Sequence, residues 1–424
     1  MTILIKGARL VDPSQGLDET GDLLLKEGKI AAIGGDLGTE AEEILDGRGL
    51  VAAPGLVDMH VHLRDPGLTY KEDVFTGCRA AAAGGVTSLL AMPNTKPPMD
   101  SPEGVRALLE KAASADAAVY TAACVTKGMQ GEELTDLEAL KAAGAIAISD
   151  DGVPVGSSRC LLEALEKAQK LGLTLTAHCE DMDLARGGKM NDGPLARELG
   201  LPGIPAAAED CGTAREIAAA ASIDAAVHIC HVSTKGSVAL IRDAKARGVR
   251  VTAETCPHYL LLTQEALRSR DADYRMNPPL RTEADRLALL TGLQDGTIDA
   301  ISTDHAPHSP EEKADFAGAP NGSIGMETSL AATLTALEGK LSLPQIIEKM
   351  SWAPAKILGI PAGTLQVGQN ADVVLFDPER KWVVDPEKLH GKSKNTPFKG
   401  MTLKGKVLVT IFRGRKVYDG REEI

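Results

Sequence analysis

The chain is poor in aromatic residues, and it has neither paired cysteines nor long apolar runs. Phe, Trp and Tyr form 3% of the 424 residues, although 43% are hydrophobic. The core must therefore consist mainly of Ala, Val, Leu and Ile, which also fill the interior layers of parallel barrels. No apolar run approaches the roughly 20 residues of a membrane span. Residues 1–6 lack the basic and apolar segments of a signal peptide, so we expect no membrane partner.

The net charge and the cysteines exclude further classes of protein. The formal net charge is -13, from 46 basic and 59 acidic residues. Such a surface repels phosphate backbones, so we expect no nucleic-acid partner. The seven cysteines are scattered singly, a pattern that favours free thiols in a reducing compartment over a disulfide framework. We therefore predict a cytoplasmic protein.

The two ends of the chain resemble each other and differ from the middle. Their β-like runs cover residues 4–11, 22–33, 371–376, 403–412 and 416–418. Turn residues separate these runs. The simplest arrangement is a small β-sandwich domain formed by residues 1–53 and 361–424, beside a central domain of residues 54–360.

The central domain alternates between β-rich apolar runs and helical stretches rich in Ala, Leu, Glu and Lys. The apolar runs cover residues 51–59, 86–92, 118–125, 145–149, 173–177, 226–230, 249–255 and 298–302. Eight strand–helix units over about 300 residues fit an α/β fold of the (β/α)8 TIM-barrel type. A doubly wound sheet is the alternative, but such a sheet seldom has eight strands whose polar residues all gather at one end.

Titratable or amide side chains follow most of these runs. In order along the chain they are His60 and His62, Asn94, Asp150 and Asp151, His178, His231, His258, and Asp304. In barrel enzymes the active site lies at the carboxyl ends of the strands. We therefore expect these side chains to meet in one site.

Histidines and carboxylates in this pattern predict a metal centre. His60 and His62 are two apart on a strand and point to the same side, and imidazole suits zinc and similar cations. A single histidine at such a position is more often a hydrogen-bonded core residue, but His178 and His231 occur in equivalent places. An aspartate after the fourth run completes the set; we favour Asp151 over Asp150, although Asp-Gly is also a common turn pair.

Such a centre would supply hydrolytic chemistry. A catalytic metal keeps a position for water and lowers the pKa of that water to about 7, so that hydroxide forms at neutral pH. A nearby carboxylate then carries the remaining proton to the leaving group. Asp304 is our candidate for this acid/base.

Four segments carry a resemblance to a known family. They read PGLVDMHVHLR at 54–64, AMPNT at 91–95, RMNPPLR at 275–281 and STDHAPH at 302–308. Together they resemble the dihydroorotase form of the amidohydrolase superfamily, and most closely its longer, type I bacterial members. The resemblance runs over essentially the whole chain. It implies reversible interconversion of N-carbamoyl-L-aspartate and (S)-dihydroorotate in pyrimidine biosynthesis, by metal-bound hydroxide.

The resemblance also implies roles for single residues. The family's metal ligands, for one or two zinc ions, match His60, His62, Asp151, His178, His231 and Asp304, and Asp304 also matches its acid/base. Its substrate-binding residues match His62, Arg64, Asn94, Asn277 and His308, with backbone contacts at Asn321 and Gly322. The planar fork of Arg64 suits a substrate carboxylate. The chain departs from the pattern at Asp65, where Glu is expected, and at Asn321, where an aromatic residue is commoner.

Two alternatives to this function differ in kind. Hydantoinases and allantoinases bridge two metals with a carboxylated lysine, whereas the fourth run ends in aspartates and contains no lysine. An inactive dihydroorotase-like partner of aspartate transcarbamoylase would lack ligands, and none is lacking here. We expect a homodimer that acts on a small molecule; association with aspartate transcarbamoylase and the number of metals stay open. Cys230 and Cys179 are one residue out of phase with the ligands and are predicted to point away from the metal.

Overall fold

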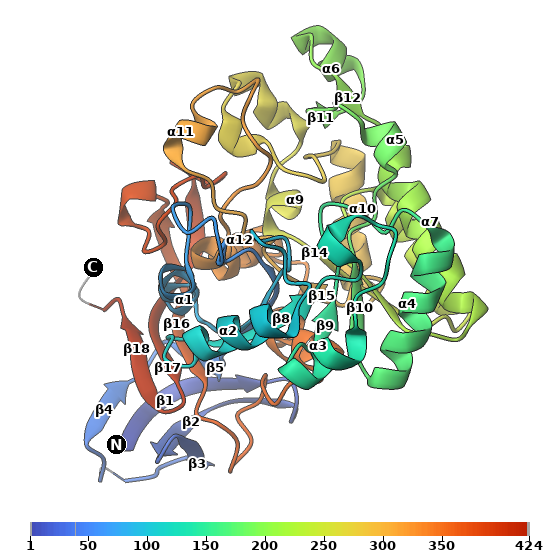
Figure 1. Cartoon of the computed structure of the whole chain (residues 1–424). Helices are drawn as coiled ribbons and strands as arrows, with labels where there is room; N and C mark the ends of the chain where they lie inside the picture. The colour runs from blue at the N-terminus through green and yellow to red at the C-terminus, as the bar shows by residue number, and fades with distance from the viewer. Residues whose placement is uncertain (1, 39, 422–424) are drawn as a thin grey trace.

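Figure 1 shows a computed structural model of the chain, which describes residues 2–38 and 40–421. Eight parallel strands occupy its centre, and neighbours in sequence are neighbours in the sheet. They are β6 (Leu56–Val61), β7 (Val86–Ala91), β8 (Ala118–Ala123), β9 (Ala147–Ile148), β10 (Thr174–Ala177), β13 (Val227–Ile229), β14 (Val251–Thr255) and β15 (Ala300–Ile301). The sheet closes where the His62 amide donates to the His305 carbonyl at 2.8 Å. The predicted (β/α)8 barrel is confirmed.

Helices cover the outside of this barrel (Figure 1). The longer helices between successive strands are α1 (Val74–Ala83), α2 (Pro102–Ala112), α3 (Leu137–Ala143), α4 (Ser158–Leu171), α7 (Ala206–Ser222), α8 (Lys235–Ala246) and α10 (Glu283–Gln294), and the short α9 (Pro257–Leu261) follows β14. Most begin at a Ser, Thr or Asp whose side chain accepts from a first-turn amide, as Ser157 does from Cys160. A side excursion of α5 (Met182–Ala185), β11 (Met190–Asn191), α6 (Pro194–Leu199) and β12 (Gly203–Ile204) projects from one rim.

The chain after β15 runs through short helices before it joins the second sheet. These are α11 (Pro310–Lys313), α12 (Ser329–Ala336), α13 (Leu343–Ile347), a π-helical turn over Glu348–Trp352, and α14 (Ala353–Leu358). Small side chains such as Ala122, Ala147 and Ala300 pack with Val57 and Leu90 inside the barrel. The interior is thus built from small and branched residues, as the scarcity of aromatics predicted. No helix among the described residues is long and apolar enough to cross a membrane.

Strands from both ends of the chain form a second sheet of eight strands (Figure 1). They are β1 (Thr2–Asp12), β2 (Leu17–Lys26), β3 (Lys29–Gly34), β4 (Glu43–Asp46), β5 (Val51–Pro54), β16 (Val373–Val383), β17 (Thr402–Phe412) and β18 (Arg415–Asp419). β5 pairs with β1 on one side and β16 on the other, and so joins the two termini. The boundaries 1–53, 54–360 and 361–424 remain a prediction.

The prediction of one strand over 51–59 was wrong. The run contains two strands: β5 belongs to the terminal sheet and β6 to the barrel. Between them lies Gly55, where a Cβ would stand 2.1 Å from Thr87 Oγ1. Both strands are wholly buried, so one unbroken apolar run serves two sheets, and periodicity alone does not reveal the break.

Candidate metal centre

The carboxylate of Asp151 lies at the centre of the carboxyl end of the barrel. Its Oδ1 is 3.4 Å from His60 Nε2 and 3.6 Å from both His178 Nδ1 and His231 Nε2. Its Oδ2 is 3.5 Å from His62 Nε2. All five side chains are buried. The strand ends thus bring together residues that are up to 171 positions apart in sequence, from His60 to His231.

Asp304 completes the cluster from the segment after β15. Its Oδ1 lies 3.1 Å from His62 Nε2 and 3.7 Å from His60 Nε2. Burial acts to raise the pKa of Asp304, but the hydrogen bond with His62 and the nearby charge of His60 hold this pKa below its usual value. The carboxylate is therefore ionised at neutral pH. All six predicted metal ligands lie in one cluster.

The cluster has the unsatisfied polar atoms that a cation would satisfy. Among the described residues, His60 Nε2 and Asp151 Oδ1 are buried and have no hydrogen-bond partner. The ring nitrogens His178 Nδ1 and His231 Nε2 face each other at 3.0 Å. Buried polar atoms are normally paired, and nitrogen and carboxylate ligands in this mixture suit zinc. The residues present therefore fit a metal ion.

The ligand atoms form two groups that share one residue. His60, His62 and Asp151 offer ligand atoms within 4.8 Å of one another, and so do Asp151, His178 and His231. A carboxylate has two oxygens and can face two cations at once. The two groups of possible ligand atoms therefore meet at Asp151.

Asp150 points away from this centre. Its carboxylate accepts from the amide of Val125 at 2.8 Å and from the amide and hydroxyl of Thr126. It thereby ties the end of β9 to the segment after β8. Burial raises the pKa of Asp150 to about 6, against the effect of these hydrogen bonds. Of the two candidate aspartates, only Asp151 faces the histidines.

Three of the four histidines are held through their second ring nitrogen. His60 Nδ1 lies 3.1 Å from Glu254 Oε1, and His178 Nε2 lies 3.3 Å from Glu180 Oε2. His62 Nδ1 contacts the amide oxygen of Asn94 at 2.8 Å. Such partners fix the tautomer and orientation of metal-binding imidazoles.

The sequence reasoning missed both glutamates, although each left a signal. Glu254 is a charged residue inside an apolar strand, and Glu180 is two residues from His178, on the same side of an extended segment. Glu254 is completely buried, with 0% exposure. A buried carboxylate needs partners, so a lone glutamate in a barrel strand could have been assigned to the interior of the site.

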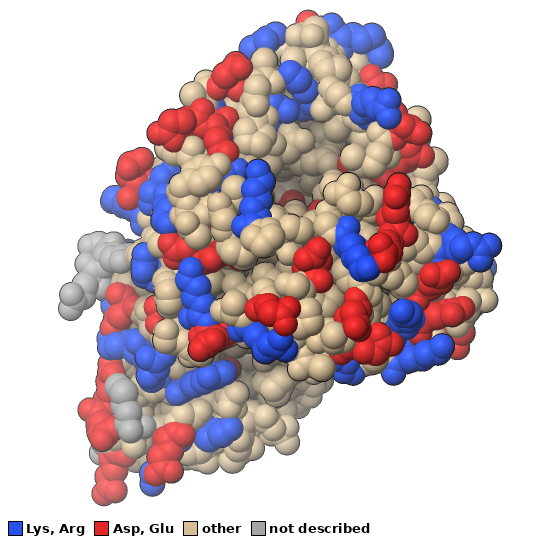
Figure 2. Space-filling model, in the orientation of Figure 1, with Lys and Arg blue, Asp and Glu red and all other residues tan. Residues whose placement is uncertain are grey.

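A cavity of about 210 Å³ opens onto the cluster. It is lined by His62, Arg64, Asn94, Asp151, Gly152, His178, His231, Asn277, Asp304, Ala306, Asn321 and Gly322. The space-filling view in Figure 2 shows a hollow below the projecting α6 segment, with acidic side chains visible inside it. Every predicted substrate residue except His308 lines the cavity.

Arg64 is placed at the cavity wall by the segment after β15. Its Nε donates to the Pro307 carbonyl at 3.1 Å, and its Nη2 lies 3.3 Å from His308 Nε2. His308 in turn contacts the Asn321 carbonyl at 2.9 Å. Burial and the charges of Arg64 and Lys71 lower the pKa of His308 to about 3. A carbonyl oxygen only accepts, so the hydrogen of this neutral imidazole lies on Nε2, and the ring stands behind Arg64 as a packing contact.

The two predicted amide residues have different surroundings. The amide of Asn94 is engaged by the centre itself, since its Nδ2 donates to Asp151 Oδ2 at 3.1 Å and its oxygen contacts His62. Asn277 donates to Glu180 at 3.0 Å, but its Oδ1 is buried without a hydrogen-bond partner among the described residues. Asn277 is thus the amide that has an acceptor to offer a bound molecule.

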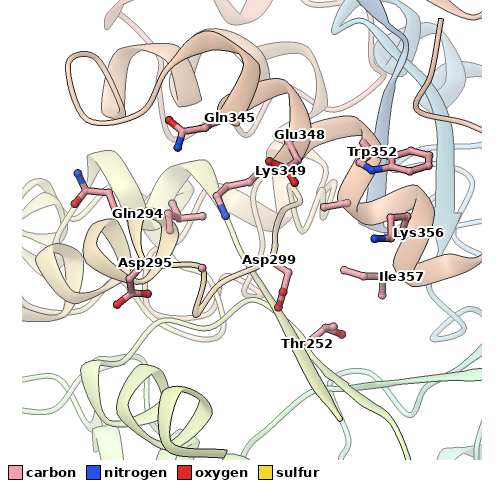
Figure 3. A pocket seen from close by; sticks show the side chains of 13 residues that line it. Thr252, Gln294, Asp295, Asp299, Gln345, Glu348, Lys349, Trp352, Lys356 and Ile357 are labelled. Atoms are coloured by element: carbon pink, nitrogen blue, oxygen red, sulfur yellow. The ribbon is translucent and has the colours of Figure 1, made fainter. Parts of the chain in front are cut away.

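A larger cavity, of about 610 Å³, lies at the opposite end of the barrel (Figure 3). Thr252 at the start of β14 and Asp299 before β15 line it. Three of its charged groups are paired: Asp299 with Lys245 at 2.7 Å, Asp295 with Arg242 at 2.7 Å, and Lys349 with the Ile298 carbonyl at 2.8 Å. Size alone would therefore select a cavity without the ligand set of a metal centre.

Known proteins resemble this chain in sequence and in fold. Residues 49–237 match the family model described as dihydro-orotase-like. The dihydroorotase of Citrifermentans bemidjiense is 50% identical over 99% of this chain and 100% of its own length, and that of Syntrophus aciditrophicus is 50% identical over 99% of both. L-hydantoinase from Arthrobacter aurescens superposes with a TM-score of 0.88 at 28% identity, covering 98% of this chain and 96% of its own. Dihydropyrimidinase from Brevibacillus agri does so at 0.86 and 30%, covering 99% and 95%.

Proposed function

This chain belongs to the dihydroorotase family, and from that premise we propose how its barrel-end cluster performs the family's reaction with zinc. The reaction is the reversible interconversion of N-carbamoyl-L-aspartate and (S)-dihydroorotate, a step of pyrimidine biosynthesis. In ring opening, water adds to a ring amide carbonyl, and the bond from that carbon to the ring nitrogen breaks. The single observation that carries the proposal is Asp151, a buried carboxylate faced by four histidines.

We propose that the cluster holds two zinc ions per subunit, for which Asp151 would supply ligand oxygens. His60 and His62 would hold one ion and His178 and His231 the other, because these are the two groups of ligand atoms that the fold brings together. Zinc, when bound, polarises a carbonyl and lowers the pKa of a coordinated water to about 7. Asn94 and Glu180 keep His62 and His178 in the orientation that binding requires.

Asp304 is the proposed acid/base. Its carboxylate is ionised and lines the cavity, so it is able to accept a proton from the attacking water. It then returns that proton to the leaving ring nitrogen, and ring closure runs the same transfers in reverse. The hydrogen bond with His62 holds the carboxylate beside the site of attack.

Arg64 is the proposed partner of the substrate carboxylate. It is buried at the cavity wall and braced by Pro307 and His308, so its fork is fixed before substrate arrives. Asn277 Oδ1 would accept from a ring or carbamoyl N–H, and the backbone of Asn321 and Gly322 would line the other side. In this proposal His308 acts by holding Arg64.

A hydantoinase-like or allantoinase-like activity is the second candidate, because the solved structures named above include a hydantoinase and a dihydropyrimidinase. Against it, an aspartate occupies the centre of the cluster, where a carboxylated lysine would be needed. Arg64 at the wall also favours a substrate that carries a carboxylate. An inactive partner role is disfavoured because the ligands and the acid/base lie together.

The test combines metal analysis with assays of the purified protein. We expect two zinc ions per subunit, loss of dihydroorotate turnover on chelation, and recovery when zinc is added back. Asp151→Asn should lose both ions. A metal-free enzyme with full activity would contradict the proposal, and so would faster turnover of hydantoin or allantoin than of dihydroorotate.

We also propose a homodimer located in the cytoplasm, where its free cysteines would stay reduced. Light scattering of the purified protein should give twice the mass of the chain. Co-elution with aspartate transcarbamoylase would show whether the two enzymes associate.

A further inference from the structure

A series of polar side chains (Glu254, His228 and Thr252) extends from the metal centre through the inside of the barrel. Glu254 on β14 places Oε1 3.1 Å from His60 Nδ1 and Oε2 3.5 Å from His228 Nε2. The other nitrogen of His228 lies 2.8 Å from Thr252 Oγ1. Thr252 lines the large cavity at the opposite end (Figure 3). This series of side chains thus extends from one end of the barrel to the other.

Glu254 determines which nitrogen His60 offers to the centre. A carboxylate accepts hydrogen bonds, so the hydrogen of the His60 ring must lie on Nδ1, toward Glu254. The lone pair of Nε2 is then directed at Asp151 Oδ1, 3.4 Å away. Without Glu254 the ring would be free to take the other tautomer, which binds no cation at Nε2.

We propose that Glu254 is a positioning residue that sets the tautomer and orientation of His60 and thereby the cation affinity of the His60, His62 and Asp151 group. This inference rests on the proposed role of His60 as a ligand. It concerns a residue that does not line the substrate cavity. Glu254 acts through His60, whose Nδ1 lies 3.1 Å from Oε1, while Oε2 faces His228 Nε2 at 3.5 Å without a hydrogen bond.

A competing interpretation is a third metal position at Glu254 itself. His60, Cys230 and Glu254 offer ligand atoms within 4.8 Å of one another, so Cys230 lies beside a predicted ligand. A cation held there would replace the contact between His60 Nδ1 and Glu254 Oε1 at 3.1 Å. We therefore assign Glu254 and Cys230 to the support of His60.

The test is zinc binding by Glu254→Leu, a substitution of similar side-chain volume that removes both oxygens and therefore the acceptor for His60 Nδ1. Metal-free protein is titrated with zinc against a chromogenic chelator. We expect one of the two sites to weaken by about 10–100-fold and the other to be unchanged. Asp22→Asn is the matched control, because Asp22 is a buried carboxylate of the terminal sheet that accepts from the Gly7 amide at 2.9 Å. It should alter stability and leave both zinc affinities as they are.

Three results separate the possible failures. Wild-type zinc affinity at both sites in Glu254→Leu would overturn the inference, provided that His60→Asn loses a site. If His60→Asn keeps both sites, the proposed function fails instead. A third zinc ion lost in Cys230→Ala would also overturn the inference, in favour of the competing metal position.

A measurement on the unaltered enzyme covers the case in which Glu254→Leu does not fold. Nitrogen NMR of the histidine rings in the zinc-loaded protein, assigned with His60→Asn, should find the His60 hydrogen on Nδ1. A hydrogen on Nε2 would overturn the inference. A purely structural role for Glu254 would change the melting temperature of the metal-free protein without changing zinc affinity.

Discussion

The two ends of the barrel differ in what their cavities leave unsatisfied. The carboxyl end has the smaller cavity, about 210 Å³, and around it His60 Nε2, Asp151 Oδ1 and Asn277 Oδ1 are buried without hydrogen-bond partners. The opposite cavity has about 610 Å³, and none of its described lining atoms is buried and unsatisfied. Unpaired buried polar atoms cost stability, so they mark the end at which a ligand is expected.

The largest expected difference between the two ends concerns carboxylates. Asp304→Asn should reduce turnover by about 10³-fold or more, because it removes a proton carrier whose effect is typically of that order. Turnover with dihydroorotate and the melting temperature are measured together. Glu348→Gln, which alters an exposed carboxylate at the opposite cavity, is the control and should leave turnover as it was. Comparable losses of turnover in the two variants would contradict the placement of the active site at the carboxyl end of the barrel.

The second-largest expected difference concerns the positively charged side chains at the two ends of the barrel. Arg64→Met should raise KM for dihydroorotate by about 10–100-fold, since a charged hydrogen bond contributes about 1.5–3 kcal/mol. Lys356→Met removes a cation that lies over the Trp352 ring at the opposite cavity, and we expect its KM to be unchanged. Steady-state kinetics at saturating zinc test both. If KM stays constant in Arg64→Met, the substrate carboxylate is bound elsewhere.

The smallest expected effect concerns Thr252 and His228, which lie between the two ends of the barrel. Thr252→Val removes the hydrogen bond to His228 Nδ1 and should lower the free energy of unfolding by about 1 kcal/mol. Denaturant midpoints measure this loss. Turnover should change less than two-fold, about 0.4 kcal/mol, because Glu254 still holds His60. A ten-fold loss of turnover would contradict this expectation, because it would show that Thr252 affects the metal centre through His228 and Glu254.

Much of the fold and of the site could be predicted because the signals are local. Apolar runs with helical stretches between them depend only on neighbouring residues. Seven of the eight runs contain a whole barrel strand, and the run over 51–59 contains the first part of β6. The side chains that follow these runs meet because parallel strands in a barrel end on one face. His60, His62, Asp151, His178, His231 and Asp304 therefore could be grouped before any coordinates were known.

Other features depended on contacts between segments far apart in sequence. The choice of Asp151 over Asp150 follows from Val125 and Thr126, which bind Asp150 across the neighbouring strand. The role of Glu254 depends on His60, 194 positions away. Such pairings arise only when the barrel closes, because strand periodicity gives the side of a residue and not its partner.

Hydrophobic pattern and strand order were enough to predict the barrel, the sheet built from both ends and the grouping of the proposed ligands. Only the folded molecule shows which ring nitrogens face Asp151, that the 51–59 run divides at Gly55 between two sheets, and that His308 stands behind Arg64. The physical reason is the same in each case. These features depend on the direction of a hydrogen bond or the space left by a neighbour, and both are properties of the packed molecule.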